Sequence, residues 1–491
     1  MTALWTTKAI VAATRGAGVG RLPQAVTGIS IDSRTVAPGE AYFAIKGDVH
    51  DGHDFVVAAL KAGAGLAVVA KDRVEDRIED RGAGRSGAFG DDAPLIVVDD
   101  VLAALRDLAA AARARSAARI VAVTGSVGKT STKEALALAL GANGETHASA
   151  ASFNNHWGVP LSLARLARSA HYAVFEIGMN HAGEITPLTR LVRPNVAIVT
   201  TVEPVHLEFF SSVAAIADAK AEIFLGLEPG GAALLNRDNP HYRRLKRRAV
   251  ETGVTHILSF GENARADARL LKCALQAEGS TVEASILGIR LAYKVGAPGK
   301  HLVMNSLAVL AAASLSGADL ARSALALAQQ APAAGRGTRI TLELPDGPAL
   351  VIDESYNANP TSMRAALALL GQASLGPGGR RIAVLGDMLE LGPAGPDLHR
   401  GLIDPIGEND VDLVFCAGPL MAALWQALPS PSRGGYAKSA AELEPQVLAA
   451  IRSGDALMVK ASAGSRMGPI VKALVRRHST ESASEPARAR G

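Results

Sequence analysis

The chain has 491 residues, of which 48% are hydrophobic, 20% charged and 4% aromatic, and its formal net charge is +4. This length exceeds that of one compact domain, and the composition is that of a globular protein rather than a disordered one. The small net charge and the few aromatic residues argue against a nucleic-acid partner. No apolar run is long enough to span a bilayer and the N-terminus lacks a signal-peptide pattern, so we expect a cytoplasmic protein without membrane insertion. Cys273 and Cys416 are too few for a disulfide framework and are expected to be packing residues.

Residues 1–113 combine short apolar strands with alanine-rich helical segments, which predicts a small α/β domain. The strands are expected at 41–47, 65–70 and 94–100. The polar, glycine-bearing stretch at 71–93 predicts an exposed loop. An alanine- and arginine-rich helix over 101–118 is expected to carry the boundary to the next domain.

Residues 114–332 alternate apolar strands with helices, which predicts a doubly wound parallel sheet. Pro332 and the glycines near it interrupt the helical pattern and mark the end of this domain. A second alternating region, residues 333–478, predicts another α/β domain with its own sheet. Residues 479–491 have almost no large apolar side chains and predict a disordered tail.

The segment "VAVTGSVGKTST" places a glycine-rich loop between a buried strand and a helix. Only Ser126 and Val127 separate Gly125 from the Gly-Lys-Thr, whereas the common phosphate loop has four residues at this point. A helix N-terminus and successive backbone N–H groups favour a bound phosphate there. Lys129 can then reach the terminal phosphates, and the hydroxyl of Thr130 can bind Mg²⁺. The structural alternative is a glycine turn with an unrelated lysine.

Glu176 and His206 each follow an apolar strand, at the sheet edge where ligands of open α/β sheets collect. A carboxylate and an imidazole at neighbouring strand ends can hold a divalent cation that bridges phosphates. Each residue, taken alone, is more often a polar group satisfied at a strand end.

Lys220 shares one helical face with Val213, Ala217 and Phe224, so its side chain lies in an apolar stripe. Burial of that kind lowers the pKa of a lysine. One alternative is a side chain that extends along the stripe to reach water. The other is a neutral amine that reacts with CO₂ and becomes a carbamate able to join Mg²⁺ binding.

These residues resemble the Mur ligase family, the ATP-dependent enzymes that form amide bonds in peptidoglycan precursor synthesis. The family motif T-G-[ST]-x-G-K-[ST] matches "TGSVGKT", N-N-x-x-G matches "NNHWG", and further matches follow in order over nearly the whole chain. The resemblance implies that ATP is bound by Thr124, Gly125, Ser126, Val127, Gly128, Lys129, Thr130, Ser131, Asn236, Asp238, His301, Asn305, Arg336 and Asp353.

The branch of the family is indicated by "DESYNANPTSM" and "LGDMLELG", which resemble the enzyme that joins D-alanyl-D-alanine to a UDP-N-acetylmuramoyl-tripeptide. The segment "IDSRTVAPGEAYFAIKGDVHDGHDF" resembles the family's uridine-nucleotide-binding region. The implied substrate-binding residues are Ser33, Arg34, Asn154, Asn155, Tyr356, Asn357, Asn359 and Lys460. The family often has V-K-G-S-R near the C-terminus. Here "VKASAGSR" leaves Ser462 and Ser465 both open as the matching serine before Arg466.

The resemblance implies three domains: a small UDP-substrate-binding α/β domain, a central P-loop-type ATP-binding domain with a doubly wound parallel sheet, and a C-terminal Rossmann-like α/β domain. ATP and two Mg²⁺ ions are the implied cofactors, with Thr130 and Glu176 on one ion and His206 and carbamylated Lys220 on the other. The implied catalytic residues are Lys129, Glu176, His206 and Lys220. They would form an acyl phosphate on the tripeptide, which the dipeptide amine then attacks. A monomer is expected.

Two other functions stay open at this stage. Another carboxylate–amine ligase, either a different Mur step or folylpolyglutamate synthase, shares the ATP domain, although "DSR" and "YNANP" argue against the folate enzyme. A nucleotide-dependent switch or transport ATPase would release phosphate without a carboxylate substrate. The third residue of the tripeptide, diaminopimelate or lysine, also stays open.

Overall fold

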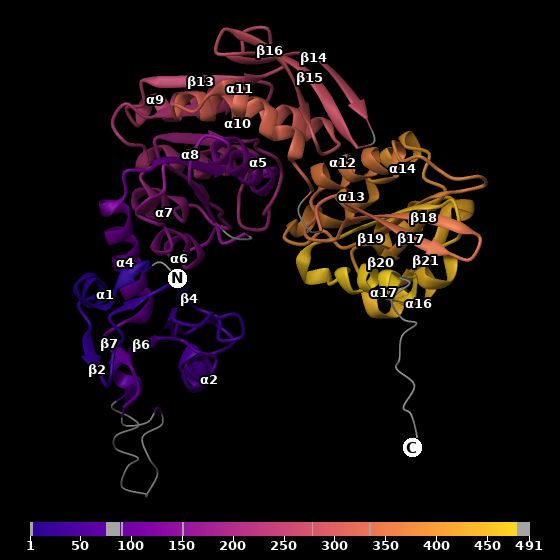
Figure 1. Cartoon of the computed structure of the whole chain (residues 1–491). Coiled ribbons are helices and arrows are strands. Elements are labelled where there is room, and N and C mark those ends of the chain that lie inside the picture. Colours follow the sequence, from indigo (N-terminus) through magenta and orange to yellow (C-terminus); the bar gives the residue numbers. More distant parts are fainter. Residues whose placement is uncertain are drawn as a thin grey trace, which may run out of the picture.

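The computed structural model describes residues 3–478 apart from 75–88, 90–91, 150–151, 277 and 333–334. The predicted loop at 71–93 lies largely outside the described residues, and the predicted tail at 479–491 lies wholly outside them. Figure 1 shows the chain as an arch, with the N-terminal domain at the foot of one side, the central domain above it and the third domain on the other side. In the described part of the chain, no helix is both long and apolar enough to cross a membrane.

The N-terminal domain is built on a five-stranded sheet that is parallel except for β2, which pairs antiparallel with β7. Its strands, in spatial order, are β2 (Ala17–Val19), β7 (Leu95–Val98), β6 (Leu66–Ala70), β5 (Ala41–Phe43) and β4 (Ile29–Ser30). The predicted strands are therefore present. Its remaining elements are β1 (Trp5–Thr6), β3 (Ala25–Val26), α1 (Thr7–Thr14), η1 (Gly52–Phe55) and α2 (Val56–Lys61).

Helix α4 (Val101–Arg115) joins this domain to the central one. Asp100 caps it by accepting a hydrogen bond from the backbone N–H of Ala103 at 2.7 Å. Its buried side packs against α6 (Gly158–Ala164), so one apolar core runs through both domains without a break. The position of the N-terminal domain is consequently set by buried apolar contacts rather than by a flexible linker.

The central domain is a nine-stranded sheet whose parallel part confirms the prediction. The strands, in spatial order, are β16 (Ile289–Val295), β15 (Gly279–Ile286), β14 (Ala268–Gln276), β13 (His256–Gly261), β12 (Ala232–Asn236), β11 (Val196–Val199), β8 (Arg119–Thr124), β10 (Tyr172–Glu176) and β9 (Thr146–Ala148). The antiparallel strands β14, β15 and β16 extend the sheet beyond the predicted strands. Leu287 and Gly288 join β15 to β16, and β15 alternates buried with partly or fully exposed residues along much of its length, as expected where one sheet face meets water.

Helices cover both faces of the central sheet, as a doubly wound fold requires. One face packs against α6, α7 (Ile185–Val192), α8 (Val213–Ala221) and α9 (Tyr242–Glu251). The other packs against α5 (Lys129–Gly141), α10 (Lys300–Leu315) and α11 (Leu320–Ala326). Successive residues of the inner strands are buried alternately in the two cores, which is why these strands are apolar throughout. The short turns η3 (Glu222–Gly226) and η4 (Leu327–Gln329) complete the domain.

The third domain has a six-stranded sheet that is parallel apart from the β17–β18 hairpin. Its strands, in spatial order, are β17 (Thr338–Leu344), β18 (Gly347–Glu354), β22 (Ala456–Lys460), β19 (Arg381–Gly386), β20 (Leu413–Ala417) and β21 (Arg433–Ala437). Its helices are α12 (Pro360–Gly371), α13 (Gly395–Arg400), α14 (Ile403–Glu408), α15 (Ala422–Ala427), α16 (Ala440–Ala450) and α17 (Gly468–His478), with short turns η5 (Gly392–Ala394), η6 (Ser430–Ser432) and η7 (Ala463–Ser465). The predicted second α/β domain is thus present, and Cys416 packs in its core.

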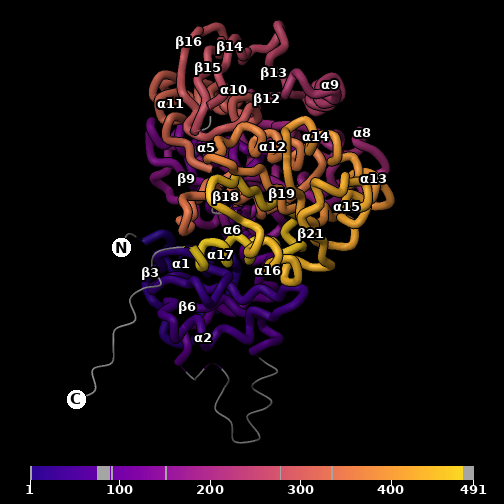
Figure 2. Tube along the Cα trace, turned by 90° about the vertical axis from the view of Figure 1, so that its right-hand side faces the viewer, coloured from indigo at the N-terminus to yellow at the C-terminus, as the bar shows by residue number. Residues whose placement is uncertain are grey.

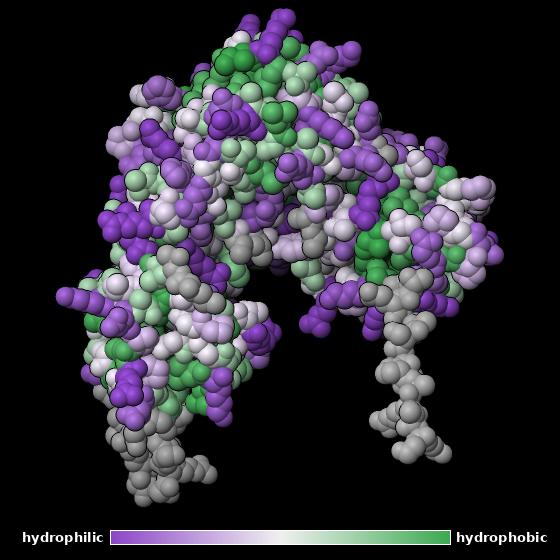
Figure 3. Space-filling view, in the orientation of Figure 1, coloured by the Kyte–Doolittle hydropathy of each residue, from purple (hydrophilic) through white to green (hydrophobic). Residues whose placement is uncertain are grey.

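The contacts between the three domains differ in extent. Figure 2, viewed from the side of the third domain, places the N-terminal domain at one end of the molecule and the β14–β16 hairpins at the other. Figure 3 shows an open space between the N-terminal and third domains, while the central domain meets both. The basic helix α9 lies on the outside of the central domain, with Leu245 and Ala249 turned into the core.

Trp5 joins the N-terminal and central domains, and its loss should weaken the fold. The side chain is 4% exposed, its indole Nε1 donates to the Ala164 carbonyl at 2.8 Å, and Arg115 lies over its ring. We expect Trp5→Ala to cost about 3–5 kcal/mol through the cavity and the unpaired carbonyl, which differential scanning calorimetry would detect as a lowered first transition. Val49→Ala, at a side chain that is 83% exposed, is the control. Equal midpoint temperatures of the first unfolding transition in the two variants would contradict this role for Trp5.

Candidate active site

Three neighbouring strand ends bring the predicted polar residues together. Strand β8 lies between β10 and β11 in parallel register, so the loop after Thr124, the side chain of Glu176 and the segment 200–206 meet at one edge of the sheet. Ligands of open parallel sheets collect at this edge. The sequence therefore assembles the site through its strand order.

The phosphate loop has the backbone that only glycine adopts easily. Gly125 has φ +152° and Gly128 has φ +85°. A Cβ at Gly125 would lie 1.9 Å from the hydroxyl oxygen of Thr200, and one at Gly128 would lie 2.6 Å from the side-chain nitrogen of Asn305. The Thr200 hydroxyl donates to the Val127 carbonyl at 2.6 Å, which fixes the turn between the glycines. The loop is therefore folded tightly against Thr200 and Asn305.

Helix α5 begins at Lys129 without a side-chain cap at Gly128, so the first N–H groups of the helix stay available to an anion. The ammonium of Lys129 donates to the Gly125 carbonyl at 2.8 Å. Burial lowers the pKa of Lys129. Glu176 opposes this shift, and Arg336 of the third domain adds to it. A lysine in this position suits a phosphate, which would restore favourable charge pairing.

Glu176 is buried, with 1% of its surface exposed, and both carboxylate oxygens accept hydrogen bonds. The Thr130 hydroxyl donates to one oxygen at 2.8 Å, and the Asn154 amide donates to the other at 2.7 Å. Three residues from separate parts of the central domain thus form one hydrogen-bonded unit. The predicted pairing of Thr130 with Glu176 lies at the mouth of the phosphate loop.

Lys220 is buried on α8, with 2% of its surface exposed, as the apolar stripe predicts. Burial, assisted by the positive charge of Lys129, lowers its pKa well below the usual value. Within the described residues, its ammonium has no hydrogen-bond or ion-pair partner. Burial therefore makes this amine easier to deprotonate than an exposed lysine.

His206 occupies the junction of the central and third domains. Its Nδ1 lies 2.5 Å from a carboxylate oxygen of Glu390, which belongs to the third domain. The hydrogen bond from His206 lowers the pKa of Glu390. A second cross-domain contact runs from the Thr361 hydroxyl to the Glu203 carboxylate at 3.2 Å. The edge of the central sheet is thus closed by side chains from the third domain.

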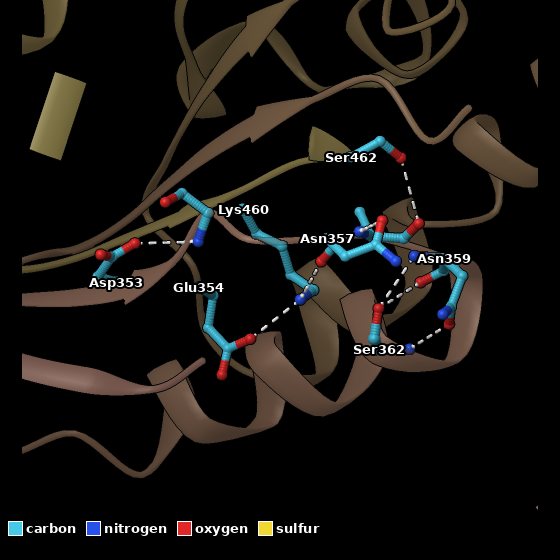
Figure 4. A network of polar contacts seen from close by, with 9 residues as sticks. Asp353, Glu354, Asn357, Asn359, Ser362, Lys460 and Ser462 are labelled. Carbon is cyan, nitrogen blue, oxygen red and sulfur yellow. Dashed lines mark hydrogen bonds and ion pairs between the residues drawn. The ribbon is translucent and has the colours of Figure 1, made fainter. Parts of the chain in front are cut away.

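The third domain contributes a network around Lys460, shown in Figure 4. The Lys460 ammonium, buried at 2% exposure, donates to the Glu354 carboxylate and to the Asn357 carbonyl, both at 3.0 Å. Asn359 caps α12 by accepting from the backbone N–H of Ser362 at 2.9 Å. The predicted polar turn therefore consists of an ion pair and a helix cap, which give it a fixed shape.

One cavity of about 590 Å³ joins these parts, and both domains line it. Its size is that of a small-molecule site. The predicted residues on its wall are Ser126, Val127, Gly128, Lys129, Thr130, Ser131, Asn154, Glu176, His206, Asn236, His301, Asn305, Arg336, Tyr356, Asn357, Asn359 and Lys460.

Other predicted residues lie outside the cavity wall. Asn155 accepts from the Gly158 backbone and so starts α6, and Asp353 accepts from the Ser355 backbone at the end of β18. Asp238 accepts from two backbone N–H groups in the turn after β13. Arg34 is an exposed side chain that forms an ion pair with Asp32. The remaining ones are Ser33, Thr124, Gly125 and Lys220.

Several residues of the site were not predicted from the sequence. Glu203 accepts from the Thr201 hydroxyl at 2.8 Å and lines the cavity, and Glu354 holds Lys460. Glu390 lies within the motif "LGDMLELG", but its contact with His206 was not predicted. Glu203 lies three residues before His206 in the segment after β11, a signal that could have found it. Glu390 and Thr361 could not be predicted from local sequence patterns, because their partners lie in another domain.

The fold and the site define a phosphate-binding α/β protein whose cavity is shared by two domains. Sequence comparison matches residues 25–113 to the family described as "Mur ligase family, catalytic domain", 123–313 to "Mur ligase middle domain" and 335–463 to "Mur ligase, glutamate ligase domain". The chain therefore belongs to the Mur ligase family, as its motifs predicted.

Curated relatives carry one common name, UDP-N-acetylmuramoyl-tripeptide–D-alanyl-D-alanine ligase. The Rickettsia prowazekii protein is 32% identical over 90% of this chain and 94% of its own length. The Escherichia coli protein is 33% identical over 91% and 93%. Among solved structures, MurF from Acinetobacter baumannii superposes with a TM-score of 0.79 at 29% identity, covering 96% of this chain and 99% of that one.

Gly125, in the loop before α5, and Gly141, the last residue of α5, allow a matched test of the loop geometry. Gly125→Ala places a methyl group against Thr200 in a backbone region disfavoured for alanine, so we expect a lower thermal midpoint and loss of nucleotide binding. Gly141→Ala, at the other end of α5, meets no atom within 4 Å and should stabilise by up to about 1 kcal/mol. Calorimetry and nucleotide titration measure both effects. Normal nucleotide binding by Gly125→Ala would refute the importance of the tight loop.

Proposed function

We propose that this protein is an ATP-dependent ligase that joins D-alanyl-D-alanine to UDP-N-acetylmuramoyl-tripeptide. The products are UDP-N-acetylmuramoyl-pentapeptide, ADP and phosphate. The proposal is carried by the cavity that places the phosphate loop and Glu176 of one domain opposite Arg336 and Lys460 of another. Similarity along nearly full length to enzymes named for this reaction supports it. The ligase would act in the cytoplasm as a monomer, in peptidoglycan synthesis, and so serve cell shape and division.

The first chemical step is the activation of a carboxylate, which is a poor electrophile. The terminal carboxylate of the tripeptide attacks the γ-phosphorus of ATP, giving an acyl phosphate and ADP. The protein contributes alignment and charge stabilisation. Lys129 and the first N–H groups of α5 would hold the phosphates, and Arg336 would approach them from the third domain. Asn236, His301 and Asn305, on the same wall, would contact the rest of the nucleotide.

The residues near the loop suit Mg²⁺. Within the described residues, no three histidine, cysteine, aspartate or glutamate side chains form a metal cluster. Mg²⁺ commonly needs only one or two protein oxygens, since phosphates and water supply the others. The adjoining oxygens of Thr130 and Glu176 fit that pattern. When bound, the ion neutralises charge that develops on the phosphates. We propose a second ion near His206 and Lys220.

Lys220 is proposed to carry a carbamate. The unpartnered, buried amine beside the charged Lys129 is favoured in its neutral form, which is the form that reacts with CO₂. The product is an anion that would pair with Lys129 and with a cation. A buried lysine that otherwise lacks a partner thereby acquires one.

The second step is the attack of the dipeptide amine on the acyl carbon, after which phosphate leaves. We propose that Tyr356 and Asn357 of the third domain hold the dipeptide, since both line the cavity beside Lys460. Asn154 would contact the peptide or a phosphate, although its amide is engaged with Glu176. The N-terminal domain, residues 1–113, would bind the UDP part through the segment that contains Ser33 and Arg34.

The substrate assignment is tested by a panel of UDP-muramoyl peptides crossed with single amino acids and D-alanyl-D-alanine. We expect phosphate release to require the tripeptide nucleotide, and a product with the added mass of the dipeptide to appear only when the dipeptide is present. Phosphate release and mass spectrometry are the two readouts. Activity with a single amino acid and none with the dipeptide would overturn the proposal. Release without any peptide substrate would favour a nucleotide switch.

The carbamate is tested by substitution and rescue. We expect Lys220→Ala to lower kcat at least about 100-fold, because a metal-binding anion is lost, and short-chain carboxylic acids to restore part of the activity. Removal of CO₂ and bicarbonate should lower the activity of the unmodified sequence in the same direction. Lys246→Ala, at an exposed position on α9, serves as the control. Full activity of Lys220→Ala would rule the carbamate out.

A further inference from the structure

Glu390 extends from the third domain to the edge of the central sheet. It lies in the segment 387–390, directly after β19. Its carboxylate lies 2.5 Å from Nδ1 of His206, and its backbone carbonyl accepts from the N–H of Glu208 at 3.3 Å. Side chain and backbone thus both contact the segment that carries His206. The two domains are joined at this point by a pair of polar contacts.

The backbone is unusual on both sides of this contact. His206 has φ +55° and Glu390 has φ +62°, in the left-handed region that residues with a Cβ rarely adopt. Neither residue is a glycine that would adopt this conformation at low cost. Such conformations persist where the surroundings fix them, and they occur often at functional sites. The facing pair is therefore held in place by the fold on each side.

Several parts of the third domain hold the segment that presents Glu390. His399, fully buried on α13, accepts from the Met388 backbone N–H at 2.9 Å through Nε2 and donates to the Gly395 carbonyl through Nδ1. The Leu389 N–H donates to the Ser462 hydroxyl at 2.9 Å. The Ser465 hydroxyl donates to the Asp387 carbonyl. The position of Glu390 is consequently determined by buried contacts, although the Glu390 side chain itself is 41% exposed.

We propose that Glu390 is a positioning residue that sets the tautomer and orientation of His206 from the third domain. A carboxylate can only accept a hydrogen bond, so in the neutral imidazole the proton lies on Nδ1 and the lone pair lies on Nε2. A carboxylate in this relation to a histidine is the arrangement that prepares imidazoles for metal binding. Because the contact crosses the domain boundary, His206 is prepared only while the two domains are closed. This inference rests on the function proposed above.

Three substitutions separate the effect of side-chain length at Glu390 from the effect of its charge. Glu390→Gln keeps the length, and its amide oxygen can turn towards Nδ1 and accept the same hydrogen bond, so we expect kcat within about threefold of the unaltered protein. Glu390→Asp keeps the charge but shortens the side chain by one methylene, and Glu390→Ala removes it. Both should lower kcat by about 10- to 100-fold, the usual effect of losing the partner of a metal-binding histidine, with little change in the KM for ATP. A charge effect alone gives the reverse order, with Asp active and Gln impaired, and would overturn the proposal.

Two further comparisons make the test specific to His206. Glu208→Gln removes an exposed carboxylate two residues from His206 and should leave kcat unchanged. In a His206→Ala background, Glu390→Asp should have no further effect. A full additional loss in that background would overturn the proposal, as would a loss in Glu390→Asp that is accompanied by an equal loss in Glu208→Gln.

A readout independent of turnover is the affinity for Mn²⁺ in the presence of a non-hydrolysable ATP analogue, measured by electron paramagnetic resonance. We expect Glu390→Asp to bind Mn²⁺ about 10- to 100-fold more weakly and Glu390→Gln to bind it normally. Equal affinities in all variants would overturn the positioning role. If the unaltered protein makes no pentapeptide product, the proposed function fails, whereas an active protein that is insensitive to Glu390→Asp contradicts this inference alone.

Discussion

The segment 200–206, which follows β11, is the part of the structure on which the rest of the site depends. Thr200 fixes the turn of the phosphate loop, and the Thr201 carbonyl accepts from the Ser126 N–H at 2.9 Å. The same segment carries Glu203 and His206, which contact the third domain. One short stretch of chain therefore shapes the phosphate site and also receives the domain that completes it. A few hydrogen bonds of this one segment thus connect the phosphate loop to the third domain.

The positively charged groups of the site favour anionic ligands. Burial lowers the pKa of both Lys129 and Lys220, and Glu176 is a buried carboxylate that accepts a hydrogen bond from Thr130 beside the phosphate loop. Bound phosphates, and the carbamate proposed on Lys220, would add negative charge next to these two lysines. The third domain has the opposite arrangement, because Lys460 is already paired with Glu354. The nucleotide side of the cavity is thus left electrostatically incomplete, while the side proposed for the dipeptide is preformed.

Local pattern predicted much of this protein, and non-local contact explains what it missed. The loop from Gly125 to Thr130 and the burial of Lys220 follow from spacing within single elements, and the structure places them as expected. The antiparallel edge β14–β16 was missed because its half-exposed strands lack the continuous apolar runs of the inner sheet. Asn359, predicted to bind substrate, also caps α12 through its side-chain oxygen, because capping and binding use the same residue types. The contact between His206 and Glu390 joins residues 184 positions apart, and no sequence period encodes it.

The proposed function requires that a carboxylate bound in the shared cavity is activated by phosphoryl transfer from ATP. The most direct test uses UDP-N-acetylmuramoyl-tripeptide labelled with ¹⁸O in its terminal carboxylate, with ATP and D-alanyl-D-alanine, followed by mass analysis of the released phosphate. An acyl phosphate transfers one carboxylate oxygen to the phosphate that departs when the amine attacks. We predict one ¹⁸O in each phosphate released. Phosphate that is unlabelled, with its fourth oxygen taken from water, would contradict the account.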